Sequence, residues 1–585
     1  MNTIRIAIIG LGSRGLSVLE QFIALSREHP QLALQLELFD PQTPGSGLHH
    51  AEQPDHLMLN TMAGQLSAFC TAHPASQPPG PTFLQWCQAQ DLRLDTRGHL
   101  APQGTGRPIG FGDFVPRRLL GRYLRDAYQW LLAHCPASLK VLEHRQRVCR
   151  VRPALAGPGW VLDSEQGEHG HFDGLFITTG HAPSLPLTEP GERVAIEGLG
   201  LTAMDTLAAL TEGRGGRFCA DHSLAGWRYQ PSGREPRIWL FSRSGLPFHA
   251  RPQGAAAAHL PWPRLFFTVE AIDALRRQAP DGQLDFAVEV LPLIEQEMRA
   301  VFYQASVQRQ APDQLAGLQQ ALRDTRAPQV LFAELAQRWG AFEPARWLAG
   351  EGWSGQGADY AAWFRQWIEH DLRRSRLGVA GSPLTQALEV WRDCRDLLRR
   401  VVDHDGLHPA STQAFYQRFA GLSNRLVGGP QKERYEDLLA LLDAGVVQVL
   451  PPCMAVQEGQ RVWLRPLDGS QPALEVDSLI HARNAHSGLS QASGSLLGDL
   501  LQQGLIRAAH PYPADGVAVD PAHRALHPDG TPHPRLWLLG PAVEGSTFYN
   551  HYVPTPDPRC LAPLQARQAV QDCLASLAMP CALAG

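Results

Sequence analysis

The first part of the chain alternates a buried-strand pattern with a helix pattern. Residues 4–9 are a run of mostly branched apolar residues, which predicts a strand covered on both faces of a parallel sheet. Apolar residues then recur at helix spacing over residues 16–25, and a second apolar run at 32–39 ends in Asp40. We therefore expect a strand, a helix and a second parallel strand, which together form one βαβ unit.

The same construction returns later in the chain. Residues 193–210 have the pattern of a strand, a glycine turn and a helix, and the apolar stretch 237–245 supplies the partner strand. Between residues 254 and 421 the pattern changes to long amphipathic stretches, which predict a mostly helical insert. Further strands are expected at 446–450, 474–481 and 535–539, and a last helix at 561–577.

Three glycines separate the first predicted strand from its helix. Gly10 permits a tight bend, Gly12 lets the backbone approach a pyrophosphate, and Gly15 lets the helix pack closely on the strand. The first N–H groups of the helix then face the negative charge, and Asp40 is placed to accept hydrogen bonds from ribose hydroxyls. Because strand, helix and terminal acid all fall in place, we interpret this segment as a dinucleotide site rather than a purely structural turn.

The second glycine turn differs from the first at two points. Gly198 and Gly200 are followed by Ala203 where a third glycine would stand, and the partner strand ends in Ser242 and Arg243 instead of an acid. A guanidinium there matches a 2′-phosphate, which favours NADP over NAD; the alternative is that Arg243 is a solvated surface residue. One turn with Asp and one with Arg suggest a bound FAD and an exchanging NADPH.

The predicted fold class is therefore α/β, with two Rossmann-like dinucleotide-binding domains, one for FAD and one for NADP, and a mostly helical insert. We expect the FAD-binding domain at residues 1–190 and 471–585 and the NADP-binding domain at 191–252 and 421–470. The insert, at 253–420, is expected to cap the substrate region. A chain of 585 residues is long enough for several such cores.

Composition and charge narrow the range of partners. The net charge is −5 and arginines are scattered among acids, so neither nucleic acid nor a membrane surface is expected as a partner. The ten cysteines form no CxxC pair and no His/Cys cluster has metal spacing, so we expect no metal site. Without a signal segment or a long apolar run, we expect a cytoplasmic protein; a homo-oligomer is compatible with the sequence.

Several segments together resemble the FAD/NAD(P)-binding family that includes bacterial FAD-dependent urate hydroxylase and the aspartate N-monooxygenase that makes nitrosuccinate. The resemblance covers most of the chain outside the helical insert. It rests on GLGSRG (10–15), PGSGLHHAEQPDHLMLN (44–60), FVPRRLLGRYL (114–124), ITTGH (177–181), GLGLTAMD (198–205) and NRLVGGPQKERYEDLLALLDAG (424–445).

This resemblance implies an FAD- and NADPH-dependent monooxygenase that uses O₂ and hydroxylates the amine nitrogen of a small amino-acid-like substrate through a C4a-hydroperoxyflavin. Such chemistry asks the protein for positioning and for exclusion of water more than for an acid and base pair. Carried over to this sequence, it implies an FAD set and an NADPH set. The FAD set is Gly10, Gly12, Gly15 and Asp40, with Gly45, Gly47 and Asn60 near the isoalloxazine; the NADPH set is Gly198, Gly200, Thr202, Ser242 and Arg243.

Four side chains are candidates for catalysis. Asn60 is one, unless it only caps its own loop as an Asx turn. His249 and Arg251 follow the NADP-side strand and are placed to face the nicotinamide or a carboxylate; the alternatives are a hydrogen-bonded loop histidine and a surface ion pair. Asn550 follows the last strand, whose terminal Gly540 is a candidate for backbone contact with FAD.

One segment departs from the plan of such flavoproteins, and two other functions stay open. HARNAHSG, residues 481–488, stands where an Ala-Thr-Gly-like turn would usually precede the last FAD segment. The first alternative function is another flavin oxidoreductase of the same plan, either a purine-like ring hydroxylase or an NADPH-dependent reductase. The second is a non-catalytic nucleotide-binding protein, because a fold does not determine a function.

Overall fold

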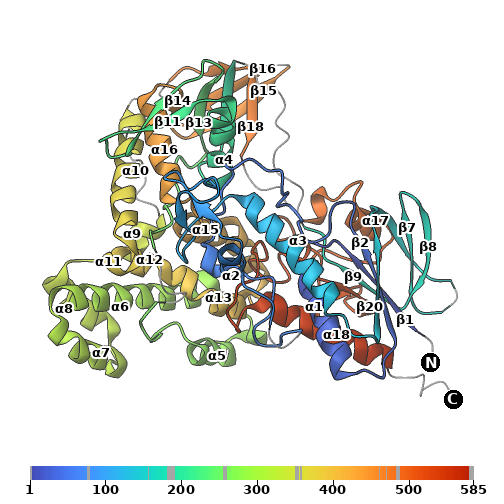
Figure 1. The fold of residues 1–585 in the computed structure, drawn as a ribbon. Coiled ribbons are helices and arrows are strands. Elements are labelled where there is room, and N and C mark those ends of the chain that lie inside the picture. The colour runs from blue at the N-terminus through green and yellow to red at the C-terminus, as the bar shows by residue number, and fades with distance from the viewer. Residues whose placement is uncertain are drawn as a thin grey trace.

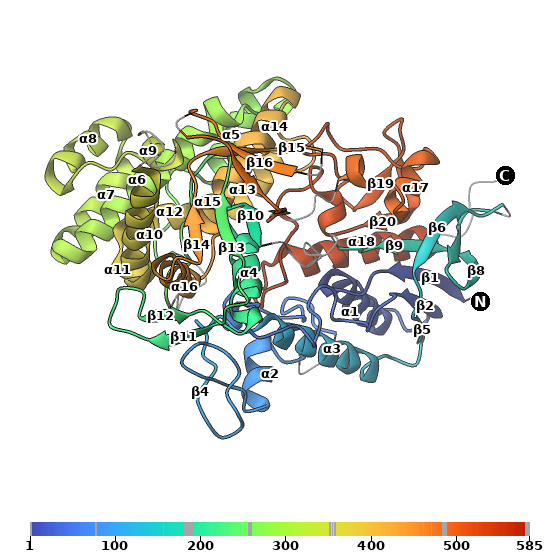
Figure 2. The ribbon, with the colours of Figure 1, turned by 90° about the horizontal axis from the view of Figure 1, so that it is seen from above.

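The computed structural model describes the chain at residues 3–75, 79–155, 157–180, 192–254, 260–349, 353, 355, 359–459, 461–469, 471–482 and 488–578. The described residues form two larger, mainly parallel sheets, four small antiparallel sheets and a group of helices between and beside them (Figure 1). No helix in the described part is long and apolar enough to cross a membrane. Seen from above, the second sheet and most helices of the insert lie to one side of the first sheet (Figure 2).

The first sheet has six strands and gathers segments from both ends of the chain. All neighbouring strands are parallel except the edge pair β19 and β20. In spatial order the strands are β19 (Arg524–Leu526), β20 (Pro532–Leu538), β9 (Gly174–Ile177), β1 (Ile4–Ile9), β2 (Leu34–Phe39) and β5 (Leu139–His144). The predicted βαβ unit is present, because β1 and β2 pair in parallel over their whole length.

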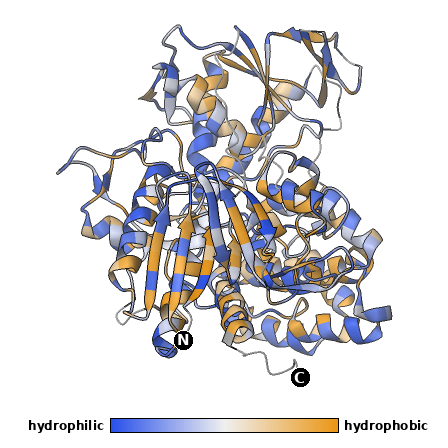
Figure 3. Cartoon of the chain, turned by 90° about the vertical axis from the view of Figure 1, so that its right-hand side faces the viewer, coloured by the Kyte–Doolittle hydropathy of each residue, from blue (hydrophilic) through white to orange (hydrophobic). Residues whose placement is uncertain are grey.

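Both faces of this sheet are covered, which explains why its central strands are so apolar. One face carries the core formed with helices α1 (Ser13–Glu28), α3 (Arg117–Ala133) and α18 (Leu561–Ala578). The other face carries β6 (Val148–Pro153), β7 (Trp160–Ser164) and β8 (Gly167–Phe172), with α17 (Leu496–Gln502) beside them. Hydrophobic segments recur on neighbouring strands of the sheet in Figure 3.

The second sheet is parallel throughout and has the strand order β14-β13-β10-β18. On one side lie α4 (Leu201–Leu210), α10 (Tyr360–Arg376) and α16 (Lys432–Asp443). On the other lies an antiparallel sheet of β15 (Cys453–Glu458), β16 (Arg461–Pro466) and β17 (Leu474–Val476). The four strands are β14 (Val447–Val449), β13 (Arg237–Phe241), β10 (Arg193–Glu197) and β18 (Ser478–His481).

One predicted boundary is wrong. Residues 471–585 were expected to belong to the FAD-binding domain, but β18 pairs in parallel with β10, Val194 opposite Ser478, and so belongs to the second sheet. β17, just before it, pairs with β16 on the same side of the molecule. A short apolar strand carries no signal for which of two parallel sheets it joins, so the pattern at 474–481 predicted the strand without its partner.

The insert is helical, as predicted, but it is more broken than its periodicity suggests. The amphipathic stretch 383–402 forms two helices, α12 (Pro383–Asp393) and α13 (Arg395–Val402), separated at Cys394. Packed with them are α5 (Val269–Gln278), α6 (Leu291–Gln310) and α15 (Ala420–Val427). The core of the insert also includes Phe548, which follows the last strand of the first sheet. That contact joins the insert to the FAD side of the molecule.

Candidate functional site

The first glycine turn has the geometry of a dinucleotide site. Gly10 lies at φ +92°, a conformation that side chains rarely adopt, and a Cβ on Gly15 would lie 2.2 Å from the Gly10 carbonyl oxygen. Helix α1 begins directly after Gly12, which as the N-cap residue has no side chain to bind the first N–H groups. Those N–H groups are therefore available to a phosphate.

Asp40 lies at the end of β2, beside this turn. One of its carboxylate oxygens accepts the N–H of Leu11 at 2.8 Å and the other accepts the N–H of Gln42 at 2.9 Å. Burial raises the pKa of Asp40 against the lowering effect of these two hydrogen bonds. Each carboxylate oxygen can accept a second hydrogen bond, so the assignment of Asp40 to the ribose stays a prediction.

Three further predicted glycines meet at the same turn. The N–H of Gly45 donates to the Leu11 carbonyl at 2.8 Å, and a Cβ on Gly47 would lie 3.1 Å from the Cα of Gly12. Gly540, at φ +88°, approaches from the end of β20, where a Cβ would lie 3.0 Å from Cγ of Arg14. The structure thus brings together glycines that are up to 530 positions apart in the sequence.

Arg14, inside the glycine turn, is a residue that the sequence analysis missed. Its side chain is 6% exposed, and its Nη2 donates to the carbonyl oxygen of Asn550 at 3.1 Å. The guanidinium also lies 4.3 Å from the ring centre of Tyr552. Its Nε and Nη1 are buried and have no hydrogen-bond partner in the described part of the chain. Buried donors without partners are costly, so this guanidinium fits the anionic pyrophosphate of FAD.

The second glycine turn has the same construction on the second sheet. Gly198 lies at φ +144°, and a Cβ there would lie 2.5 Å from the Ala482 carbonyl oxygen. Gly200 is the N-cap residue of α4 and again has no side chain to cap the helix. Thr202 stands in the first turn of α4. This second helix N-terminus therefore also presents backbone N–H groups to an anion.

Ser242 and Arg243 follow β13 as predicted. The Ser242 side chain forms a hydrogen bond within the turn, whereas the Arg243 side chain is exposed. The hydroxyl of Ser242 accepts the N–H of Gly245 at 3.0 Å, which fixes the turn after the strand. Arg243 is exposed and forms no ion pair with any described residue. An exposed, unpaired guanidinium beside the turn is compatible with a 2′-phosphate, so the role of Arg243 stays a prediction.

Two of the predicted catalytic residues, Asn60 and Arg251, lie next to the segment that contains Pro430 and Gln431. Arg251 forms a single β-bridge with Gln431, and its N–H donates to the Pro430 carbonyl at 2.7 Å. The side chain of Gln431 reaches the carbonyl of Leu59, next to Asn60. No hydrogen bond from the Asn60 side chain to its own loop occurs among the described residues, which leaves the Asx-turn interpretation without support.

His249 is buried in a hydrogen-bonded group. Its Nδ1 lies 2.7 Å from Oδ1 of Asp371 on α10, and the other Asp371 oxygen accepts the N–H of Ala250 at 2.6 Å. Burial lowers the pKa of His249 despite the neighbouring carboxylate, while His249 and Arg374 lower the pKa of Asp371 against the effect of burial. This geometry fits the alternative of a hydrogen-bonded loop histidine that joins the NADP-side strand to the insert.

The side chain of Asn550 is also occupied. Its amide nitrogen donates to a Glu544 carboxylate oxygen at 3.1 Å and to the Thr547 carbonyl at 2.9 Å, and the residue is 4% exposed. Its main-chain carbonyl oxygen accepts the hydrogen bond from Arg14. The structure therefore places Asn550 beside the first glycine turn through its backbone, and its side chain stabilises the loop.

The segment 481–488, which departs from the plan of such flavoproteins, is only partly described. His481 pairs with Glu197 at 2.5 Å, whereas residues 483–487 lie outside the described residues.

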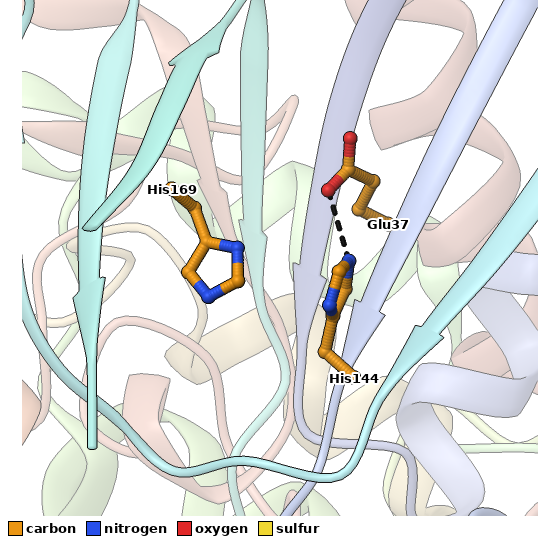
Figure 4. Close-up of side chains that lie close together, drawn as sticks. All are labelled: Glu37, His144 and His169. Carbon is orange, nitrogen blue, oxygen red and sulfur yellow. Dashed lines mark hydrogen bonds and ion pairs between the residues drawn. The ribbon is translucent and has the colours of Figure 1, made fainter. Parts of the chain in front are cut away.

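One cluster of possible metal ligands exists in the described part of the chain: Glu37, His144 and His169 (Figure 4). His144 Nε2 lies 2.9 Å from one Glu37 oxygen, and the Arg5 guanidinium lies 2.6 Å from the other. The His144 ring stacks on Phe39 with centroids 4.5 Å apart. Arg5 already neutralises the carboxylate, so the geometry fits a hydrogen-bonded network on the sheet.

Comparison with known proteins agrees with this geometry. The family described as FAD-NAD(P)-binding matches residues 7–182. The chain is 31% identical to an L-aspartate N-monooxygenase (nitrosuccinate-forming) of Streptomyces davaonensis, with 92% of each chain covered. It is 29% identical to nitrosuccinic acid synthase npaA of Aspergillus oryzae, with 92% of this chain and 88% of the other covered. The chain belongs to the FAD- and NAD(P)-dependent N-monooxygenase family.

Membership of the N-monooxygenase family confirms the predicted class, a flavin-dependent monooxygenase, and the predicted cofactors, FAD and NADPH. Among solved structures, ornithine hydroxylase PvdA of Pseudomonas aeruginosa matches over 98% of this chain and 100% of its own, with 11% identity and a TM-score of 0.42. The individual site residues are not assigned by these comparisons, and their roles stay predictions.

Proposed function

We propose that this N-monooxygenase oxygenates the amine of a small acidic amino acid, with NADPH and O₂ as co-substrates. The relatives that match over nine-tenths of the chain are named for aspartate or for nitrosuccinate, the corresponding oxidised product. The observation that carries the proposal is this similarity over nine-tenths of a chain with two glycine turns, each of which precedes a helix without a side-chain cap.

Each of the two glycine turns would bind one of the two dinucleotides. The turn at Gly10, Gly12 and Gly15, with the unpartnered donors of Arg14, would hold FAD. The turn at Gly198 and Gly200 would hold the pyrophosphate of NADPH. Bound FAD, once reduced by NADPH, supplies the activated oxygen that N-oxygenation requires. The protein then has to orient the substrate amine and to exclude water from it.

The loop between β2 and α3 is the part of the chain that covers the first turn. Hydrogen bonds from the 424–445 segment fix this loop. The side chains of Gln431 and Arg434 donate to the carbonyl oxygens of Leu59 and His56, respectively. The Arg97 guanidinium donates to the Asp437 carboxylate on α16 at 2.8 Å. These contacts bind the FAD-side loop to the NADP side, which supports a site closed off from water between the two.

The test compares cofactors and products in one preparation. Purified protein with bound FAD is reduced anaerobically with NADPH or NADH, then mixed with air-saturated buffer that contains L-aspartate or, in a parallel assay, a purine, and the products are analysed by mass. Oxygen incorporation at the aspartate nitrogen supports the proposal. NADPH oxidation without oxygen in any amine product would instead indicate a reductase, and oxygen on a purine ring would indicate a ring hydroxylase.

A further inference from the structure

Arg251 presents a buried charge that its surroundings do not satisfy. The residue is 3% exposed, and its Nε and Nη1 have no hydrogen-bond partner among the described residues. The nearest carboxylate oxygen, on Glu389, is 3.7 Å away, beyond hydrogen-bond distance. The backbone is firmly held, because the Arg251 carbonyl accepts the Ser375 hydroxyl at 2.8 Å. A fixed backbone with an unsatisfied guanidinium is typical of a ligand site.

Arg395 is only partly buried, but it has one buried guanidinium nitrogen without a partner among the described residues. It is the first residue of α13, its Nη2 is buried without a partner, and its guanidinium lies 3.7 Å from the ring centre of Tyr549. Burial lowers the pKa of Arg395, and the neighbouring charges of Arg399 and Arg251 lower it further. Arg251 is therefore one of the charged neighbours of Arg395.

Glu389, the acid nearest to Arg251, does not neutralise the charges of both arginines. Glu389 on α12 also binds Arg392, whose Nε lies 2.7 Å from a Glu389 oxygen. Glu389 is therefore shared, and at 3.7 Å it does not satisfy the guanidinium of Arg251.

Arg395 contacts the flavin side of the molecule through Tyr549, which is also a neighbour of Arg251. The Tyr549 ring beneath Arg395 belongs to the segment whose next residue, Asn550, binds Arg14 of the first glycine turn through its carbonyl. The Tyr549 carbonyl in turn accepts Nη2 of Arg399 at 3.0 Å, which fixes the ring against α13. One residue thus separates the arginine pair from the contacts of the predicted FAD site.

We propose that Arg251 and Arg395 form a clamp that binds the two carboxylates of a dicarboxylic amino acid, each guanidinium taking one carboxylate. The inference rests on the proposed function and adds the residues that determine its specificity. A guanidinium matches the planar geometry of a carboxylate and donates two parallel hydrogen bonds to it. The unsatisfied donors of both arginines then acquire partners, and the substrate amine is held between the insert and the flavin side.

The test measures binding and turnover separately on protein with bound FAD. Calorimetry with succinate, a dicarboxylate without an amine, is carried out on the wild type and on Arg251→Gln, Arg395→Gln and Arg400→Gln. Arg400 lies on the same helix α13 but is exposed and paired with Asp273 at 2.8 Å, which makes it the matched control. Loss of one charged hydrogen-bonding partner should weaken binding about tenfold to a hundredfold.

The outcomes distinguish this inference from the proposed function. Weaker succinate binding in both site variants, with Arg400→Gln unchanged and FAD content intact, supports the clamp. Binding that neither substitution weakens overturns it, as does a wild type that binds neither succinate nor L-aspartate. A wild type that oxygenates L-aspartate while the variants bind succinate normally refutes the clamp alone. Succinate binding through both arginines without any oxygenated amine refutes the proposed function alone.

Discussion

Arg117 and Asp205 form an ion pair of 2.6 Å that joins the helix beneath the FAD-side loop to the helix of the second glycine turn. Arg117 begins α3 and also donates its Nε to the Met58 carbonyl at 3.0 Å. Asp205 lies on α4, within its first two turns, and is 6% exposed. The pair therefore ties the helix of the second glycine turn to α3 and to the loop that covers the first turn.

Replacing Asp205 with Asn should weaken the communication between the two sites. The amide cannot neutralise Arg117, and loss of a partly buried charged pair costs about 1–3 kcal/mol. We expect flavin reduction by NADPH, followed anaerobically in a stopped-flow spectrometer, to slow by about tenfold, which corresponds to about 1.4 kcal/mol. FAD content should be retained.

The neighbouring Arg118 offers a matched control. It pairs with Asp55 inside the FAD-side loop, and among the described residues it forms no hydrogen bond or ion pair with α4. Asp55→Asn removes an ion pair from the adjacent arginine of the same helix, and it should leave the reduction rate near the wild-type value. Equal slowing in both variants would mean that the loop, and not the link between the two helices, governs reduction.

Gly15→Ala should abolish FAD retention. The added Cβ would lie 2.2 Å from the Gly10 carbonyl oxygen, so the helix and the turn must move apart. The ratio of flavin absorbance to protein absorbance after gel filtration measures the effect. Gly421→Ala is the control, since Gly421 lies in α15 with nothing within 4 Å of its Cβ position and alanine favours a helix.

Gly200→Ala tests the second turn in a milder way. Its Cβ would lie 3.2 Å from the ring of Phe248, a side chain that can shift slightly. We expect the KM for NADPH to rise while bound FAD stays at its wild-type level. Loss of FAD in this variant would show that the two turns do not serve separate dinucleotides.

Arg243→Gln should reduce the preference for NADPH. If the exposed guanidinium binds the 2′-phosphate, its removal costs about 1.5–3 kcal/mol with NADPH only, or about tenfold to a hundredfold in kcat/KM. NADH lacks that phosphate, so its kcat/KM should not change. Arg228 on β12 (Trp227–Gln230) is a similarly exposed arginine, and Arg228→Gln serves as the control. Parallel losses with both cofactors would assign Arg243 no part in the selection.

The glycine turns were predictable because their signal is local. A strand, a turn and a helix occupy adjacent residues, so the pattern at Gly10, Gly12 and Gly15 contains the geometry that the structure shows. The partners of Arg251 were not predictable in the same way. Glu389 and Arg395 lie more than 130 positions away, on helices whose repeated arginines have the pattern of an ordinary amphipathic surface.

The same limit explains the misplaced strand and the missed arginine. β18 is a short strand with no distinctive pattern, and only the long-range pairing with β10 assigns it to the second sheet. Arg14 lies inside the first glycine motif, in which the sequence pattern assigned roles to the glycines alone. Its burial depends on Asn550 and Tyr552, which approach from the other end of the chain. Sequence pattern thus predicted the cofactor turns, while the contacts beside them required the fold.

Glu20 should make the protein less stable as the pH rises. It lies on α1, is 1% exposed, and accepts the Cys70 N–H at 2.9 and 3.0 Å; burial raises its pKa to about 8. The folded state therefore holds the proton more tightly than the unfolded chain, whose glutamate titrates near about pH 4.3. Stability from this group is full below the unfolded pKa and is lost as the pH rises through the folded one.

The Glu20→Gln variant has no carboxyl group at this position that could lose a proton. Its melting temperature should therefore fall less than that of the wild type between about pH 5 and about pH 8. Melting curves of protein with bound FAD across this range measure the difference. Glu28→Gln is the control, because Glu28 lies on the same helix but is exposed and paired with Arg567 at 2.8 Å. If the Glu20→Gln curve runs parallel to the wild type at every pH, Glu20 is ionised in the folded protein and burial does not control its charge.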